Sequence, residues 1–122
     1  MILVDSCGWL EYFADGPLAD KYFKYLKNPL SVIVPTIVEY EVYKKAKRSF
    51  SEEKAISAAA QMHFCRVVPL SAHLALWAAD LSLTHDLPMA DAIIYATAQA
   101  EKCQVVTSDE HFKNLPEVIF IK

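Results

Sequence analysis

Short apolar runs alternate along the chain with longer segments in which apolar residues recur at helical spacing. Runs such as VIV and VVPL show no alternation of polar and apolar positions, which is typical of strands buried on both faces of a sheet. Strands are predicted at residues 1–4, 31–34, 66–70, 104–107 and 118–121. Helices are predicted at residues 7–14, 17–27, 37–48, 52–63, 72–84 and 89–102. Pro17, Ser51 and Ser71 stand at the starts of three of these helices, where such residues are favoured.

This order of elements indicates the fold class. Strands separated by helices need crossover connections, which join parallel strands. We therefore expect an α/β fold, three-layer α/β/α, with a central parallel sheet of four to five strands. The 122 residues contain no linker, repeat or low-complexity tract, so we expect a single domain over residues 1–122.

Composition narrows the class of protein. The chain is 54% hydrophobic and 22% charged, which is typical of a globular core and excludes disorder. The longest apolar runs are too short to cross a bilayer, and the first one ends at Asp5 without a basic flank, unlike a secretion signal. We therefore expect a cytoplasmic protein with no membrane partner. Three cysteines, none in a C-x-x-C pair, predict reduced and mostly buried thiols.

The formal charge of −3 argues against a partner held by overall positive charge. Binding of nucleic acid would then require local basic residues or bound cations, because phosphate is repelled by an acidic protein.

Two acids follow predicted strands. Asp5 comes directly after the first strand, and Asp109 stands two residues beyond the fourth. In open α/β sheets, ligands bind outside the carboxyl ends of the strands, so a site is expected at this edge. Two further acids have apolar neighbours: Asp91 in LPMADAIIYATAQA, and one acid in VPTIVEYEVYKK. In the latter segment Glu39 and Glu41 point about 200° apart on a helix, and periodicity does not choose between them.

Each acid alone has an ordinary structural interpretation, as a helix cap or a solvated helix residue. Together, four carboxylates in one crevice would raise one another's pKa and would be stable at neutral pH only with cations among them. Oxygen ligands with no histidine or cysteine at matching positions favour Mg²⁺ or Mn²⁺ over zinc. In-line hydrolysis of a phosphodiester by an activated water is the reaction that such a site suits.

Four segments read in order resemble the PIN-domain nucleases, and most closely the VapC toxins of prokaryotic toxin-antitoxin pairs. The segments are ILVDS, VPTIVEYEVYKK, LPMADAIIYATA and VVTSDEHF, and the resemblance covers essentially the whole chain. It implies a PIN-like fold in which the catalytic acids are Asp5, Glu41, Asp91 and Asp109, with Glu39 as a neighbour.

The same resemblance implies a metal-dependent endoribonuclease that hydrolyses RNA, the toxin of a type II toxin-antitoxin system. Asp5, Asp91 and Asp109 would hold Mg²⁺ or Mn²⁺, and Ser6 and Thr107 would supply supporting hydroxyls. The family also implies a VapB-like cognate antitoxin and a homodimer as partners.

The basic run and the histidines can each be interpreted in more than one way. The run KKAKR, residues 44–48, lies just beyond Glu41 and is either a solvated helix end or a contact for phosphate. The four histidines have no paired spacing, and only His111, two residues after Asp109, is placed to touch a substrate.

Rival classes fit less well. A receiver-like signalling domain needs an acidic pair near its start and a lysine after a later strand, and the chain has neither. A phosphotransfer hydrolase with an aspartate nucleophile needs a second aspartate where Cys7 stands. A catalytically silent PIN-fold module that binds nucleic acid or protein is the remaining alternative, and the full set of four acids weighs against it.

Overall fold

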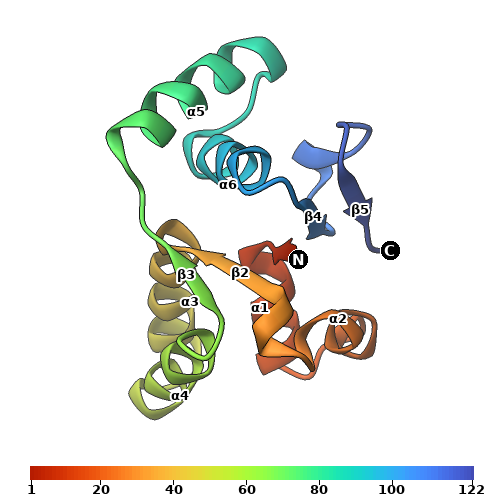
Figure 1. Cartoon of the computed structure of the whole chain (residues 1–122). Helices are drawn as coiled ribbons and strands as arrows, with labels where there is room; N and C mark the ends of the chain where they lie inside the picture. Colours follow the sequence, from red (N-terminus) through yellow and green to blue (C-terminus); the bar gives the residue numbers. More distant parts are fainter.

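A five-stranded parallel sheet forms the centre of the molecule, with strand order β3-β2-β1-β4-β5 (Figure 1). The computed structural model describes residues 1–122. The strands are β1 (Ile2–Val4), β2 (Val32–Pro35), β3 (Arg66–Val68), β4 (Gln104–Thr107) and β5 (Val118–Phe120). Leu3 in β1 pairs with Ile33 in β2 on one side and with Val105 in β4 on the other. The predicted parallel sheet is confirmed.

Six α-helices and two short 3-10 helices connect the strands. The α-helices are α1 (Ser6–Phe13), α2 (Ala19–Leu26), α3 (Thr36–Ser49), α4 (Glu52–Met62), α5 (Ala72–His85) and α6 (Met89–Ala100). The 3-10 helices are η1 (Pro29–Ser31) and η2 (Glu110–Phe112). Every predicted α-helix and strand is present, with ends that differ by no more than two residues. None of the helices has the length and apolar character needed to traverse a bilayer.

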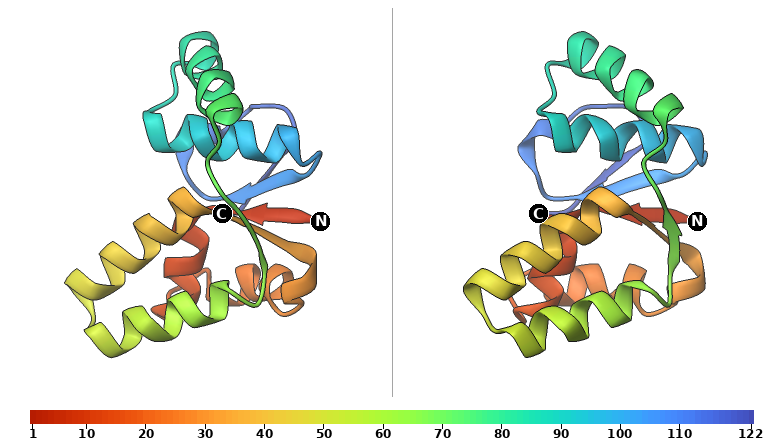
Figure 2. Two further views of the ribbon diagram at one scale, coloured as in Figure 1. Left: turned by 60° about the vertical axis from the view of Figure 1, so that its left-hand side comes forward. Right: turned by 90° about the vertical axis from the view of Figure 1, so that its left-hand side faces the viewer.

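The helices cover both faces of the sheet. The connections from β1 to β2 and from β2 to β3 step in one direction, and the connection from β3 to β4 steps back. Since such crossovers are right-handed, α1 to α4 are expected on one face and α5 and α6 on the other. Figure 2 shows this arrangement, with α6 and α5 above the sheet and the other four helices below it. The predicted three-layer α/β/α order is confirmed.

The core is densest around the central strands and α6. Residues 32–34 of β2 are fully buried, and every residue of α6 from Asp91 to Ala98 is buried. Burial of each large aliphatic side chain contributes about 1.5–3 kcal/mol to stability. The helix that carries Asp91 is therefore held rigidly against the sheet.

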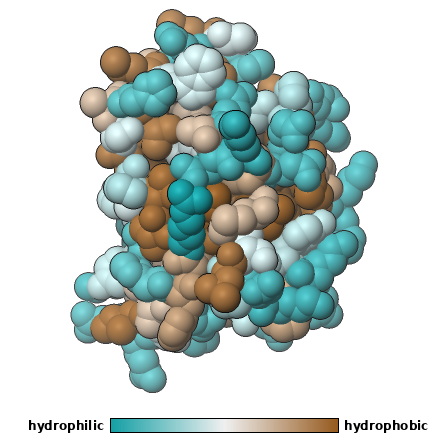
Figure 3. All heavy atoms as spheres, in the orientation of Figure 1, coloured by the Kyte–Doolittle hydropathy of each residue, from teal (hydrophilic) through white to brown (hydrophobic).

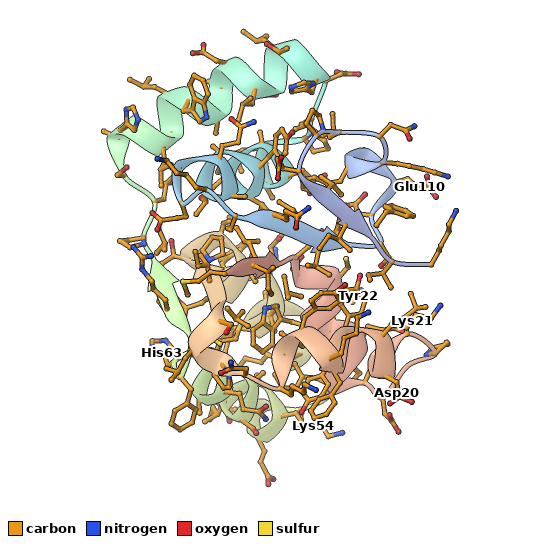
Figure 4. The ribbon with its side chains drawn as sticks, turned by 45° about the vertical axis from the view of Figure 1, so that its right-hand side comes forward. Asp20, Lys21, Tyr22, Lys54, His63 and Glu110 are labelled. Carbon is orange, nitrogen blue, oxygen red and sulfur yellow. The ribbon has the colours of Figure 1, made fainter.

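A close approach of α1 and α2 requires a glycine. A Cβ atom at Gly8 would lie 2.6 Å from Cδ1 of Tyr22 and 2.7 Å from Cγ1 of Val4. Glycine at this position lets the ring of Tyr22 pack against α1, and Tyr22 is fully buried as a result. Figure 4 shows Tyr22 pointing inward from α2, while Asp20 and Lys21 of the same helix point outward.

The outer helix α5 exposes apolar side chains. Leu76 is 72% exposed and Leu83 is 85% exposed, and the apolar residues over the upper part of the molecule are visible in Figure 3. All three cysteines are free, as predicted; Cys103 is buried, whereas Cys7 and Cys65 are half-buried.

Candidate active site

The carboxyl ends of β1 and β4 lie side by side because the two strands pair in parallel, and the strand order changes direction between them. Ligands bind in the crevice at such a point in open α/β sheets. Asp5 directly follows β1, and Asp109 stands two residues beyond β4. The two acids that the sequence places after strands therefore lie at the same edge of the sheet.

Asp5 is 2% exposed and is held by both neighbouring elements. Its Oδ1 accepts a hydrogen bond from the backbone N–H of Ser6 at 2.7 Å, which makes Asp5 the N-cap of α1. Its Oδ2 accepts a hydrogen bond from Oγ1 of Thr107 at 2.8 Å. Burial raises the pKa of Asp5, and the hydrogen bonds from Thr107 and Ser6 oppose that rise. Capping thus fixes the orientation of a carboxylate at this edge of the sheet.

Thr107 connects the first acid to the last. It is fully buried at the end of β4, donates to Asp5 and accepts a hydrogen bond from the backbone N–H of Asp109 at 2.9 Å. Ser6 lies at the mouth of the site, with its Oγ 3.4 Å from Oδ1 of Asp5. Both hydroxyls that the resemblance singles out therefore contact Asp5.

Asp91 and Asp109 meet through a histidine. Asp91 lies in the first turn of α6, and Nδ1 of His111 is 3.0 Å from its Oδ2 and 2.9 Å from Oδ1 of Asp109. One ligand atom from each of these three residues lies within 4.8 Å of the others. Asp109 also caps η2, since its Oδ1 accepts a hydrogen bond from the N–H of His111.

The expectation that no histidine or cysteine stands at a matching position is wrong. His111 lies between two of the acids because η2 turns its ring back toward α6. Cys7 lies beside a third acid, with its Sγ 3.5 Å from Oδ2 of Asp5. The sequence showed His111 near Asp109 but contained no sign that Asp91 would share it.

The structure separates Glu41 from Glu39. Oε1 of Glu41 is buried without a hydrogen-bond partner, and burial raises the pKa of this carboxyl, with further increases from the charges of Asp5 and Asp109. Glu39 instead lies 2.6 Å from Nε2 of His63, which stands at the end of α4. Of the two glutamates that periodicity left open, Glu41 is the one that faces the other acids.

Electrostatics shows that the four carboxylates act on one another. The pKa of Asp91 is raised to about 7, first by burial and then by the charges of Asp109, Asp5 and Glu41, while His111 lowers it. Carboxylates that interact this strongly are seldom ionised at the same time unless a cation offsets their charge.

A divalent cation fits this set of donors. Carboxylate oxygens are the ligands that Mg²⁺ and Mn²⁺ prefer, and the unpaired Oε1 of Glu41 is an acceptor without a donor. His111 adds one nitrogen at the outer edge.

The hydrogen-bond network around Asp5 extends to further polar side chains, which the sequence did not predict. The hydroxyl of Tyr22 donates to Oγ of Ser108 at 2.8 Å, and Sγ of Cys7 lies 3.4 Å from Oγ1 of Thr107. Burial, together with the charge of Asp5, raises the pKa of Cys7, so its thiol stays protonated. The hydroxyl of Tyr22 has no local sequence signal because its partner Ser108 is 86 positions away.

Both the sequence and the fold of the chain resemble those of known proteins. The profile of the PIN domain matches residues 2–118. No curated protein sequence matches significantly.

Several solved structures are similar over their whole length. The chain of a toxin-antitoxin complex from Klebsiella pneumoniae has a TM-score of 0.81 and 23% identity, covering 98% of this chain and 96% of that one. VapC20 of Mycobacterium tuberculosis, a Sarcin-Ricin loop cleaving toxin, has a TM-score of 0.82 and 22% identity, covering 100% and 99%. A chain of VapBC2 from Rickettsia felis, bound to a promoter DNA fragment, has a TM-score of 0.76 and 20% identity, covering 99% and 98%. At these identities the likeness concerns the fold.

Proposed function

Because the chain belongs to the PIN domain family, we propose that it is a metal-dependent endoribonuclease that hydrolyses RNA phosphodiester bonds, the toxin of a toxin-antitoxin pair. The observation that carries the proposal is the convergence of Asp5, Glu41, Asp91 and Asp109, in which burial and mutual repulsion raise the pKa of three carboxyls. Such crowding is unfavourable in a protein that binds no cation and useful in one that does.

In this proposal Asp5, Asp91 and Asp109 hold Mg²⁺ or Mn²⁺, and Glu41 binds directly or through water. When bound, the cation supplies Lewis-acid stabilisation of the phosphate and activation of the attacking water. The protein's own side chains would position the phosphate and the attacking water.

Two carboxyls have distinct roles in positioning. The N–H of Ser6 and the hydroxyl of Thr107 hold both oxygens of Asp5 in place before substrate arrives. Preorganisation of this kind removes reorganisation from the reaction step. The free Oε1 of Glu41 would accept a hydrogen bond from the attacking water, and the raised pKa makes this carboxyl a better proton acceptor than an ordinary glutamate.

A cognate antitoxin is the protein partner that we propose. The structures from Klebsiella pneumoniae and Rickettsia felis contain toxin-antitoxin complexes, and this chain covers nearly all of the matched chain in each. The homodimer stays a prediction from the family.

The test is incubation of the purified protein with a panel of structured RNAs, with Mg²⁺, with Mn²⁺ and with EDTA. We expect cleavage with either metal and none with EDTA, and we expect Asp5→Asn to keep the circular dichroism spectrum but to lose cleavage. Cleavage that resists EDTA, or wild-type activity in Asp5→Asn, would contradict the mechanism. A folded protein that cuts no RNA with any metal would favour the silent binding module.

A further inference from the structure

A stripe of basic side chains follows Glu41 along α3. Lys44, Lys45 and Arg48 stand three, four and seven positions after it, which places all four residues on one face of the helix. The three basic residues, here called the basic stripe, are exposed. Since α3 begins at the carboxyl end of β2, the stripe leads away from the acids and toward the outer end of the helix (Figure 2).

The basic stripe and Glu41, one of the four acids, line one hollow. It has a volume of about 260 Å³, and its lining includes Ser6 and Glu41 at one end and the whole basic stripe, with Tyr40 beside it. Ser6 directly follows Asp5 and contacts its carboxylate. A chain bound in this hollow therefore lies beside Glu41 and Ser6, and Ser6 contacts a second acid of the site.

The positive charges of the stripe are not neutralised within the protein. The structure contains six ion pairs, and none includes a residue of the basic stripe. On the same helix Lys47, by contrast, pairs with Glu52 at 3.5 Å. Although the whole chain has a formal charge of −3, the basic stripe concentrates positively charged side chains without ion-pair partners close to the acidic site. Phosphate would be drawn to the stripe, despite the acidic total charge.

An exposed aromatic ring accompanies these cations. Tyr40 is 58% exposed, and Nζ of Lys44 lies 5.3 Å from the centre of its ring and donates to its hydroxyl at 3.2 Å. Proteins that bind single-stranded nucleic acid combine a basic groove for the backbone with aromatic rings on which bases stack. An acidic peptide would use the cations alone, so the exposed ring favours RNA as the occupant.

We propose that the basic stripe and Tyr40 form the subsite for the single-stranded RNA segment next to the scissile phosphodiester, with phosphates along the stripe and one base stacked on Tyr40. The proposal rests on the ribonuclease function proposed above. From Glu41 to Arg48 the helix advances about 10 Å, at about 1.5 Å per residue. A stripe of this length is long enough to contact more than one phosphate of a bound strand.

The experiment measures binding of a fluorescein-labelled, single-stranded RNA of mixed sequence by fluorescence anisotropy at several salt concentrations. The Asp5→Asn variant serves as the parent, so that the RNA stays intact in the presence of Mn²⁺. Lys44→Ala and Arg48→Ala should each weaken binding and reduce the salt slope by about 0.7. Tyr40→Ala should weaken binding roughly five- to hundredfold, whereas Tyr40→Phe, which keeps the ring, should bind like the parent.

Lys54→Ala is the matched control. Lys54 also lies over an aromatic ring, with Nζ 5.6 Å from the centre of Phe50, but it stands on α4 outside the hollow (Figure 4). Its loss removes one positive charge, as Lys44→Ala does, and should leave RNA affinity unchanged. Circular dichroism of each variant checks that the fold is kept.

Three results would overturn the subsite. The first is unchanged RNA affinity in Arg48→Ala and Tyr40→Ala, and the second is an equal loss of RNA affinity in Lys54→Ala. The third is that the stripe variants lose binding to a labelled poly-glutamate peptide but keep their RNA affinity. Cleavage separates this proposal from the parent one. Wild-type protein that binds RNA through the stripe but cuts none with Mg²⁺ or Mn²⁺ supports the subsite and contradicts the ribonuclease. Full cleavage when Arg48→Ala or Tyr40→Ala is placed in the otherwise wild-type chain, with Asp5 intact, contradicts the subsite and leaves the ribonuclease in place.

Discussion

Thr107 donates a 2.8 Å hydrogen bond from its Oγ1 to Oδ2 of Asp5, and this bond joins the ends of two strands that are 102 positions apart in the sequence. The same oxygen of Thr107 accepts from the N–H of Asp109. One buried hydroxyl therefore sets the relative position of two of the four acids.

Replacing Thr107 by valine should reduce RNA cleavage about 10- to 100-fold, because residues that orient metal-binding carboxylates have effects of this size. The concentration of Mn²⁺ needed for half-maximal cleavage should rise as well. Thr107→Ser keeps the hydroxyl and should stay near wild type. Thr97→Val is the control, since Thr97 is equally buried and its hydroxyl donates to Ile93 within α6; a similar loss of cleavage there would contradict the role of Thr107.

The two glutamates of α3 offer a matched pair. Glu41→Gln should lower the cleavage rate by about 10² to 10³, the effect of removing one preorganised electrostatic group from an active site. Glu39→Gln changes the same chemical group on a side chain that contacts His63 and should cut at nearly the wild-type rate. Single-turnover cleavage with excess enzyme measures both. Equal rates in the two variants would show that Glu41 has no special role.

The free energy of unfolding should depend on pH when EDTA removes divalent cations. The pKa of Asp91 is about 7 in the folded protein and returns to its ordinary value of 3.8 on unfolding. Between these values the folded state holds more protons, so stability falls as pH rises from about 4 to 7. Urea unfolding at a series of pH values should show this decline.

Two comparisons test the assignment of that decline to Asp91. Asp91→Asn should flatten it, whereas Asp80→Asn, a change at an exposed position on α5, should leave it as in the wild type. Added Mg²⁺ or Mn²⁺ should restore stability at high pH, because both bind the ionised carboxylates of the folded state. A steeper decline in Asp91→Asn would refute the assignment.

Gly8→Ala should destabilise the protein by about 1–3 kcal/mol, the usual effect of an extra methyl group in a filled core. The added Cβ meets the ring of Tyr22 and the side chain of Val4, and both are buried. Gly16→Ala should have a smaller effect, since its Cβ meets only the carboxylate at the end of the flexible Glu11 side chain, whose displacement costs the hydrogen bond from the N–H of Leu18. Urea unfolding compares the two, and a larger loss at Gly16 would contradict this account of α1 packing.

Much of the fold was predictable because its signals are local. Unbroken apolar runs such as residues 32–34 need cover on both faces, and helical segments between them need crossovers, so a parallel sheet with two helical layers follows. The same reasoning placed Asp5 and Asp109 at one edge, since the ends of parallel strands meet there. These expectations use only neighbours in sequence and the geometry that all parallel sheets share.

The arrangement of the site was decided by tertiary structure. Sequence spacing placed Glu39 and Glu41 on different sides of one helix, but the packing of α3 determines which side faces Asp5. The position of His111 between Asp91 and Asp109 depends on how η2 turns after β4.

By itself, then, the sequence determined the order of the strands and helices along the chain. It also determined the edge of the sheet at which acids gather, because burial periodicity and chain direction are properties of short segments. The tertiary structure alone decided which glutamate joins that edge, which histidine bridges it and which hydroxyls hold it. Those contacts join side chains from elements far apart in the chain, and their geometry depends on helix rotation and loop path, which no local pattern of residues specifies.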